Sequence, residues 1–156
     1  MEIKFKIINM LSNTCKYALR ALIYLGKYSE EDSRIGIKKI SEDLQLSSPF
    51  LGKILQNLVK QKLLVSTKGP NGGFALGKKA GNITLWDIVT KVDGEEFFTN
   101  CLITLEPCQM HDPSKPLCPV HTQYDKLRKE ISAFYKDTTL AIISQDIDKY
   151  EEFVKL

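Results

Sequence analysis

The 156-residue sequence has no apolar run that approaches the roughly 18 residues a membrane-spanning helix needs. Its first twenty residues carry charges throughout and lack the continuous apolar stretch of a secretory signal. It also contains no internal repeat and no low-complexity tract. We therefore expect a cytoplasmic protein without a membrane partner. Disulfides are rare in that compartment, and clustered cysteines there more often bind metal or sense redox state.

Several enzyme signatures are missing as well. There is no C-x-x-C motif beside a βαβ pattern, as thiol oxidoreductases often have, and no phosphate-binding G-x-x-x-x-G-K-[ST] loop. No strand-turn-helix elbow presents a nucleophile. We therefore predict that the protein is not an enzyme. A thiol-dependent enzyme built on a Cys–His pair stays open as a lesser alternative, as does a protein–protein adaptor.

What the chain does contain is enough apolar material for a core and an uneven distribution of charge. Apolar residues make up 43% of the sequence, which suits one folded domain with an extension. Residues 1–94 hold 15 Lys and Arg against 8 Asp and Glu, a net charge of +7, whereas residues 95–156 hold 7 against 11, a net charge of −4. A basic first part favours nucleic-acid binding, although a solvated lysine-rich surface would give the same count.

Apolar residues at helical spacing predict three helices in the first part of the chain. The first covers residues 12–29, with Cys15 on its apolar face as a buried small hydrophobe, and a shorter one covers residues 37–44. In the third, residues 49–61, Ser48 is the expected N-cap and Pro49 the first helical residue. Its predicted buried stripe consists of Leu51, Ile54, Leu55 and Leu58.

A hairpin and a fourth helix follow. Two β-like runs, residues 63–67 and 72–76, are joined by the turn "KGPNGG". Thr84 is the expected N-cap of the fourth helix, with Asp87 completing a capping box, and Gly94 ends it. Three helices and a hairpin predict a winged helix-turn-helix domain over residues 10–94, in a fold that is mainly α with a small β-hairpin wing.

In such a domain the third helix enters the major groove of DNA, and the wing reaches the adjoining backbone or minor groove. Glycine-rich turns are also common without any ligand, so the turn alone decides little. Together with the basic helix before it, the pattern favours DNA contact by two sets of residues. They are Ser47, Ser48, Pro49, Phe50, Lys53 and Asn57 on the helix, and Lys68, Gly69, Pro70, Asn71 and Gly72 in the turn.

Residues 95–120 form a long segment without a clear helical or strand period, and soft metal ligands are concentrated there. Cys101, Cys108, Cys118 and His121 have the spacing C-x6-C-x9-C-x2-H. Three thiolates and an imidazole can hold zinc, iron or an iron–sulfur cluster, and the spacing does not choose among them. A loop with free thiols is a further alternative.

A long helix is predicted over residues 121–145, followed by a tail at residues 146–156. Apolar or small residues recur at alternating spacings of three and four, which favours pairing with another helix. The predicted seam consists of Tyr124, Leu127, Ile131, Phe134, Thr138 and Ala141. We therefore expect a homodimer joined through this helix.

The segments "TCKYALRALIYLG", "LVSTKGPNGGFAL" and "ITLWDIVTKVDG", with the later cysteine-rich loop, resemble the Rrf family of bacterial transcription regulators. The resemblance covers about residues 10–143 and rests on fairly specific motifs. It implies a homodimer in which each recognition helix and wing binds one half of a pseudo-palindromic operator. Gly52 stands where several family members have a polar or acidic reader, so the resemblance does not carry over an operator sequence.

The resemblance also implies that the loop holds an iron–sulfur cluster, 2Fe–2S or 4Fe–4S, which controls operator binding. Cluster-binding members have three cysteines in the corresponding loop, and one of them has a ligating His three residues after the last, as in Cys118–His121. In some members the partner's first helix adds a ligand, but Lys16 and Arg20 at these positions cannot ligate at neutral pH. A zinc site or a cysteine thiol switch stays open as the alternative.

Overall fold

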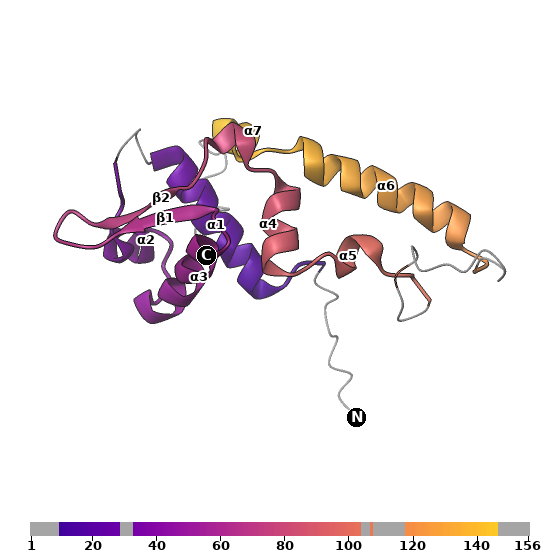
Figure 1. Cartoon of the computed structure of the whole chain (residues 1–156), viewed down its shortest axis with the longest axis horizontal. Helices are drawn as coiled ribbons and strands as arrows, with labels where there is room; N and C mark the ends of the chain where they lie inside the picture. Colours follow the sequence, from indigo (N-terminus) through magenta and orange to yellow (C-terminus); the bar gives the residue numbers. More distant parts are fainter. Residues whose placement is uncertain (1–9, 29–32, 104–106, 108–117, 147–156) are drawn as a thin grey trace, which may run out of the picture.

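The computed structural model describes residues 10–28, 33–103, 107 and 118–146. A compact head contains the first three helices and the hairpin, and a long helix extends away from it (Figure 1). In the part described, the fold is mainly helical with one two-stranded antiparallel sheet. In chain order the elements are α1 (Asn13–Tyr28), α2 (Ile37–Asp43), α3 (Ser48–Lys60), β1 (Leu64–Thr67), β2 (Gly73–Leu76), the 3-10 turn η1 (Ala80–Asn82), α4 (Leu85–Val92), α5 (Glu96–Thr99), α6 (His121–Asp137) and α7 (Leu140–Asp146).

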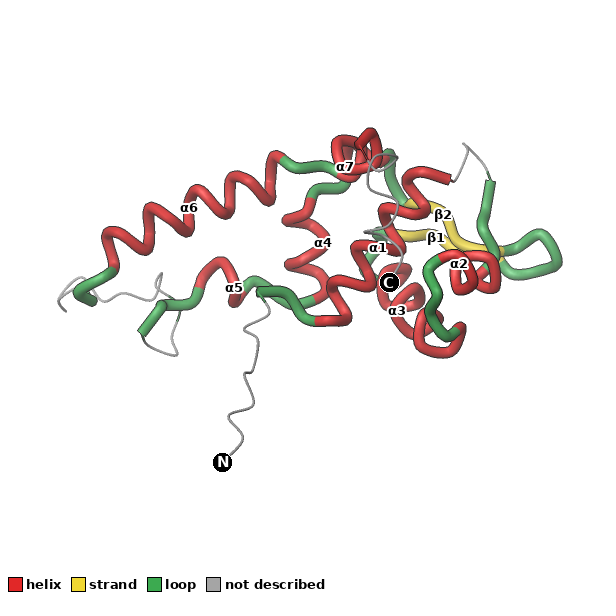
Figure 2. Tube along the Cα trace, turned by 180° about the vertical axis from the view of Figure 1, so that it is seen from behind, coloured by secondary structure: helices red, strands yellow, loops and turns green. Residues whose placement is uncertain are grey.

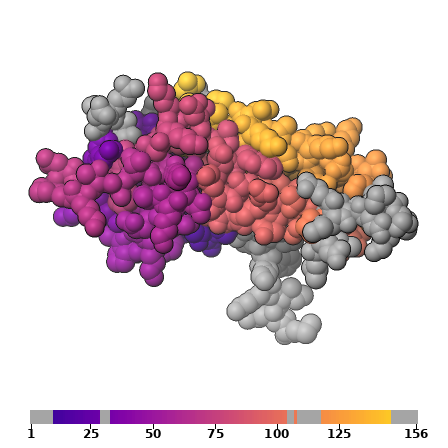
Figure 3. Space-filling model, in the orientation of Figure 1, coloured from indigo at the N-terminus to yellow at the C-terminus, as the bar shows by residue number. Residues whose placement is uncertain are grey.

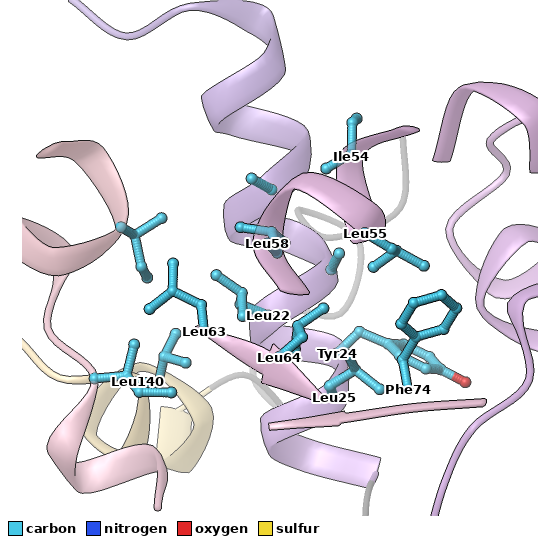
Figure 4. Packing of buried hydrophobic residues seen from close by; sticks show 14 of the residues in the cluster. Leu22, Tyr24, Leu25, Ile54, Leu55, Leu58, Leu63, Leu64, Phe74 and Leu140 are labelled. Carbon is cyan, nitrogen blue, oxygen red and sulfur yellow. The ribbon is translucent and has the colours of Figure 1, made fainter. Parts of the chain in front are cut away.

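The core of the head forms where α1, α3 and the start of the hairpin meet. All four residues of the predicted α3 stripe are buried, and so is Cys15 of α1, as predicted. Ala18 and Leu22 of α1 are buried as well. Figure 4 shows leucines of α1, α3 and β1 pointing toward one another, with Phe74 of β2 at the edge of the cluster. The helical periodicity therefore predicted the buried side of α3 correctly.

The start of α3 differs from the prediction by one residue. Ser47, in an extended conformation, is the N-cap, and Ser48 is already helical. The Ser48 hydroxyl donates to the Ser41 hydroxyl at 2.9 Å, and Ser41 in turn donates to the Leu46 carbonyl at 2.6 Å. Ser48 therefore holds the turn between α2 and α3 instead of capping the helix.

The wing is an antiparallel hairpin that is supported on its second edge. β1 pairs with β2 in the register Leu64–Leu76 to Thr67–Gly73, and Ile35 forms an isolated bridge with Phe74. The Ile35 N–H donates to the Phe74 carbonyl at 3.0 Å, and the Phe74 N–H donates back at 2.9 Å. A Cβ at position 73 would lie 2.5 Å from the Ile35 carbonyl oxygen, so glycine is required for this close approach.

The fourth helix has the predicted capping box. The Thr84 hydroxyl accepts from the Asp87 N–H at 3.1 Å, and the Asp87 carboxylate accepts from the Thr84 N–H at 3.2 Å. After Asp93, the C-cap, Gly94 adopts φ +91°, a left-handed conformation typical of glycine at a helix end. Both predicted ends of this helix are confirmed.

The segment after Gly94 is not irregular from its first residue, because Glu96–Thr99 forms the short helix α5. Its Phe98 is buried, with its ring 4.1 Å from that of Trp86 and 5.2 Å from that of Tyr135 between centroids. Four residues are too few to produce a helical period in the sequence. The aromatic packing against α4 and α6 fixes this turn.

The predicted helix over residues 121–145 is divided into α6 and α7 (Figure 2). Thr138 and Thr139 leave the helix and pair with the start of α4. The Leu85 N–H donates to the Thr138 carbonyl at 2.9 Å, and Thr139 bridges Thr84. β-Branched threonines suit such an extended connection. The chain thereby returns to the head, where Leu140 is fully buried.

The long helix α6 has no buried residue among those described. Ile131 and Tyr135 pack against the core, whereas Leu127 and Phe134 are 51% and 59% exposed. The six residues of the predicted seam therefore do not form one exposed surface. Ile131 faces the protein's own core, whereas Leu127 and Phe134 face outward. None of the helices in the described ranges combines the length and the apolarity needed to cross a membrane.

Candidate nucleic-acid interface and metal centre

Helix α3, the predicted recognition helix, turns polar side chains outward. Ser47, Pro49, Phe50 and Lys53 are exposed, while Ser48 and Asn57 are half-buried. Of the predicted contacts, Ser48 is the least available, because its hydroxyl is bonded to Ser41. The remaining predicted residues lie on the side of α3 that faces away from the core.

Phe50 is 41% exposed although it is a large apolar residue. Its ring packs edge-on against Tyr17 of α1, with centroids 5.1 Å apart and an interplanar angle of 89°. The guanidinium carbon of Arg20 lies over the Tyr17 ring, 5.7 Å from the ring centroid. An aromatic pair with a cation therefore lies between the start of α3 and the middle of α1.

Two further exposed residues of α3 are not among the predicted DNA contacts. Gln56 and Lys60 lie on the same outward side as Lys53, since positions 53, 56 and 60 follow the helical period opposite the buried stripe. The same period could have identified them. Gly52 does not face outward freely, because a Cβ there would lie 3.3 Å from Cδ1 of Ile37 on α2.

The wing tip projects from the head as a separate lobe in the space-filling view (Figure 3). Lys68, Gly69, Pro70 and Asn71 are exposed there, and Gly72 is half-buried. The tip therefore presents one cation and accessible backbone, as the sequence predicted.

A second cation beside the wing was not predicted. Arg34 is exposed, and its Nε donates to the Thr67 hydroxyl at 2.7 Å. This bond holds the Arg34 side chain against the end of β1. Within the described residues no carboxylate forms an ion pair with Arg34, Lys53 or Lys68. The positive charges of these three residues are therefore not neutralised by ion pairs within the described part of the chain.

The four predicted metal ligands divide between described and undescribed residues. Cys101 follows α5, and Cys118 and His121 stand at the start of α6, whereas Cys108 lies outside the described residues. The His121 N–H donates to the Cys118 carbonyl at 2.9 Å, which places these two residues in one turn. Asn100, which precedes Cys101, forms an isolated antiparallel bridge with Pro107.

The chemistry of the described donors fits a soft metal centre. The thiols of Cys101 and Cys118 are half-buried, and the Ile103 N–H points to the Cys101 sulfur at 3.5 Å. Such N–H donors stabilise the negative charge of a cluster-bound thiolate. In the described part of the chain, no three candidate ligands are assembled into a group. The geometry of the complete set therefore depends on Cys108.

Several contacts connect this loop to the head. Arg128 of α6 donates from Nη1 to the Thr99 carbonyl at 3.1 Å and from Nη2 to Asp125 at 2.6 Å. On the other side of α5, Phe98 stacks on Trp86 of α4, and Lys136 lies 4.3 Å above the Trp86 ring. The start of the cysteine loop is therefore held by both α4 and α6.

The C-terminal end of α4 is in turn joined to α1. The N–H and the hydroxyl of Ser12 both donate to the Asp93 carboxylate, and the Ser12 hydroxyl accepts from the Cys15 N–H at 3.0 Å. Cys15 is fully buried, as predicted. Burial, with the nearby Asp93 carboxylate, raises the pKa of its thiol to about 12. It is a core residue and a poor candidate for a metal ligand in this arrangement.

Comparison with known proteins agrees with this architecture. The chain is 33% identical over 131 residues to an Aquifex aeolicus protein named as an HTH-type transcriptional regulator, covering 84% of this chain and 88% of that one. It is 33% identical over 139 residues to the HTH-type transcriptional regulator IscR of Yersinia enterocolitica, covering 88% and 81%. CymR, the global cysteine regulator of B. subtilis, has the same fold, with a TM-score of 0.67 at 24% identity over 86% of this chain and 95% of that one.

These relatives are transcriptional regulators, in agreement with the prediction that the protein is not an enzyme. A family model described as Rrf2, iron-dependent transcriptional regulator, matches residues 11–146. That match spans the head, the loop and the returning helix α7. The family match and the identity to these relatives show that this chain belongs to the Rrf2 family of transcriptional regulators.

Proposed function

We propose that the protein is a homodimeric, DNA-binding transcription regulator whose affinity for its operator is controlled by an iron–sulfur cluster in the loop after α5. The observation that carries the DNA-binding part is the outward face of the head. Lys53 on α3, Lys68 at the wing tip and Arg34 beside the wing are exposed and form no ion pair with a carboxylate of the described residues. A recognition helix in the major groove and a wing on the backbone would use these groups directly.

Phosphate contacts make the binding dependent on salt. Each neutralised phosphate releases a counterion, so the logarithm of the affinity falls linearly with the logarithm of the salt concentration. Lys68→Ala is expected to weaken binding to all duplexes alike and to reduce that slope by about one. Lys126→Ala, an exposed lysine on α6 outside the head, is the matched control and should leave the slope unchanged. We place this activity in the cytoplasm, where the bacterial chromosome lies.

The homodimer is proposed from the exposed apolar side of α6. Leu127 and Phe134 stand seven residues apart, so they share one side of the helix, and more than half of each side chain is exposed. A second copy would cover both residues by antiparallel or parallel pairing of α6. Leu127→Lys with Phe134→Lys is expected to give a monomer in sedimentation. Lys126→Glu, an exposed change on the same helix, should leave the dimer intact.

The cluster would be held by Cys101, Cys108, Cys118 and His121. When bound, it would supply a redox- and nitric-oxide-sensitive centre linked by metal–sulfur bonds to both ends of the loop. The chain's own residues then relate the loop to the head. The hydrogen bond from Arg128 to the Thr99 carbonyl joins α6 to the end of α5. The contact between the Phe98 and Trp86 rings joins α5 to α4. A change in loop geometry would thereby alter how the two heads are spaced on DNA.

Oxygen-free purification tests this part. The protein is expected to be coloured, to contain iron and sulfide, and to bind its operator with a different affinity after complete removal of the cluster, at fixed salt. Cys101→Ser or Cys118→Ser should lower the iron content, whereas Cys15→Ala, which removes a core thiol, should not. Colourless protein that contains stoichiometric zinc would instead support a zinc site. Metal-free protein with unchanged affinity would reject metal control.

A further inference from the structure

The start of α3 presents an aromatic ring on a face that is otherwise polar apart from the neighbouring Pro49. Phe50 lies in the first turn of α3 and is 41% exposed. Along the same helix the exposed side chains after it are Lys53, Gln56 and Lys60. In helix-turn-helix proteins the N-terminal residues of the recognition helix contact the base edges. Phe50 therefore stands where bases are read.

The ring is held in place before any DNA is bound. Its edge-on contact with Tyr17, at 5.1 Å between centroids, fixes one side of the ring against α1. With 41% of the residue exposed, part of the side chain is still accessible. Because the side chain is already ordered by this contact, little conformational freedom would be lost when the accessible part is covered by a ligand.

The chemistry of the ring limits what it can recognise. In the major groove, guanine, cytosine and adenine present hydrogen-bonding groups, whereas thymine adds a C5 methyl group, which apolar side chains such as phenylalanine contact. Phe50 has no donor or acceptor to offer to the polar edges. Gly52, two residues on, contributes no side chain either. The apolar methyl group is the feature of the groove that this position can select.

We infer that Phe50 specifies thymine at one position of each operator half-site by covering its C5 methyl group. This inference rests on the proposed function and deepens it. Polar readers nearby, such as Lys53 and Gln56, would specify other positions, since lysine pairs with guanine and glutamine with adenine. The thymine contact differs from these in depending on a single methyl group, which can be removed from DNA without changing base pairing.

The test uses the full-length protein and a duplex that it selects from a random pool. Each thymine of that duplex is replaced in turn by deoxyuridine, which lacks only the methyl group. Binding is expected to weaken about fourfold at one thymine in each half-site, and about fifteen-fold when both are replaced, as expected for loss of one buried methyl group per half-site. This scan requires no protein variant.

Two variants then test whether the loss of affinity on removing the methyl group depends on Phe50. Phe50→Ala should bind the thymine and deoxyuridine duplexes equally, while Phe50→Leu keeps an apolar side chain and should retain part of the difference. Lys53→Ala is the matched control: it should weaken binding to both duplexes and preserve their ratio. Circular dichroism of each variant shows whether the head remains folded.

The outcomes separate the two proposals. A selected duplex in which no thymine methyl group matters, or a difference that persists in Phe50→Ala, would overturn the assignment of Phe50 while leaving DNA binding intact. A pool that yields no preferred sequence would overturn the proposed function and this inference with it. A methyl effect that is present in the unaltered protein and absent in Phe50→Ala establishes the contact.

Discussion

Leu140 provides a quantitative test of how α7 is joined to the head. Its side chain is fully buried, although it follows a helix that extends away from the core. The Leu140 N–H donates to the Ile83 carbonyl at 2.9 Å, so the backbone is held as well. Because the surroundings cannot collapse fully around a truncated side chain, Leu140→Ala should lower the free energy of unfolding by about 3 kcal/mol.

The matched control is Ile142→Ala on the same helix. Ile142 is 52% exposed, so its truncation should change the free energy of unfolding by less than about 0.5 kcal/mol. Urea unfolding followed by circular dichroism, at one protein concentration, measures both. With a slope of about 2 kcal/mol per molar urea, the Leu140 variant should unfold at about 1.5 M less urea. Equal midpoints for the two variants would refute the placement of α7 in the core.

Three further predictions concern single groups. Because burial and the Asp93 carboxylate raise the pKa of Cys15 to about 12, folded protein freed of any metal should resist alkylation there at pH 8 while the loop cysteines react, as peptide mass mapping would show. Thr84→Ala removes half of the capping box and should lower the free energy of unfolding by about 1 kcal/mol in urea titration. Hydrogen bonding to Lys129 helps to lower the pKa of Asp125 to about 2, so its ion pairs should persist at pH 4 and be lost as the pH falls through about 2, as NMR titration of its carboxyl carbon would show.

The head was predictable because its signals are local and repeated. The α3 stripe, the capping box at Thr84 and the left-handed Gly94 each follow from a residue pattern that has one common structural meaning. The wing was equally clear, since two short apolar runs flank a turn rich in glycine. The cap of α3 was assigned one residue late, because Ser47 and Ser48 have the same chemistry and only the tertiary bond to Ser41 distinguishes them.

The remainder depended on contacts between distant segments. The helix break at Thr138 could not be predicted from periodicity, because it is fixed by pairing with Leu85, more than fifty residues earlier. Arg34 was missed for a similar reason, since its place beside the wing is set by Thr67. In the candidate metal centre, the donors were proposed from residue types, and their role as ligands stays a prediction. Their arrangement stays a prediction because Cys108 lies outside the described residues.

The chain contains a single tryptophan, and its position has a practical consequence. Trp86 lies between the Phe98 ring and the Lys136 ammonium group, where α4, α5 and α6 meet. Its indole emission should therefore change in wavelength and intensity if α5 separates from α4, without any attached dye. Rapid-mixing fluorescence on the unlabelled protein could follow in real time whether a signal at the cysteine loop reaches the head before the operator is released.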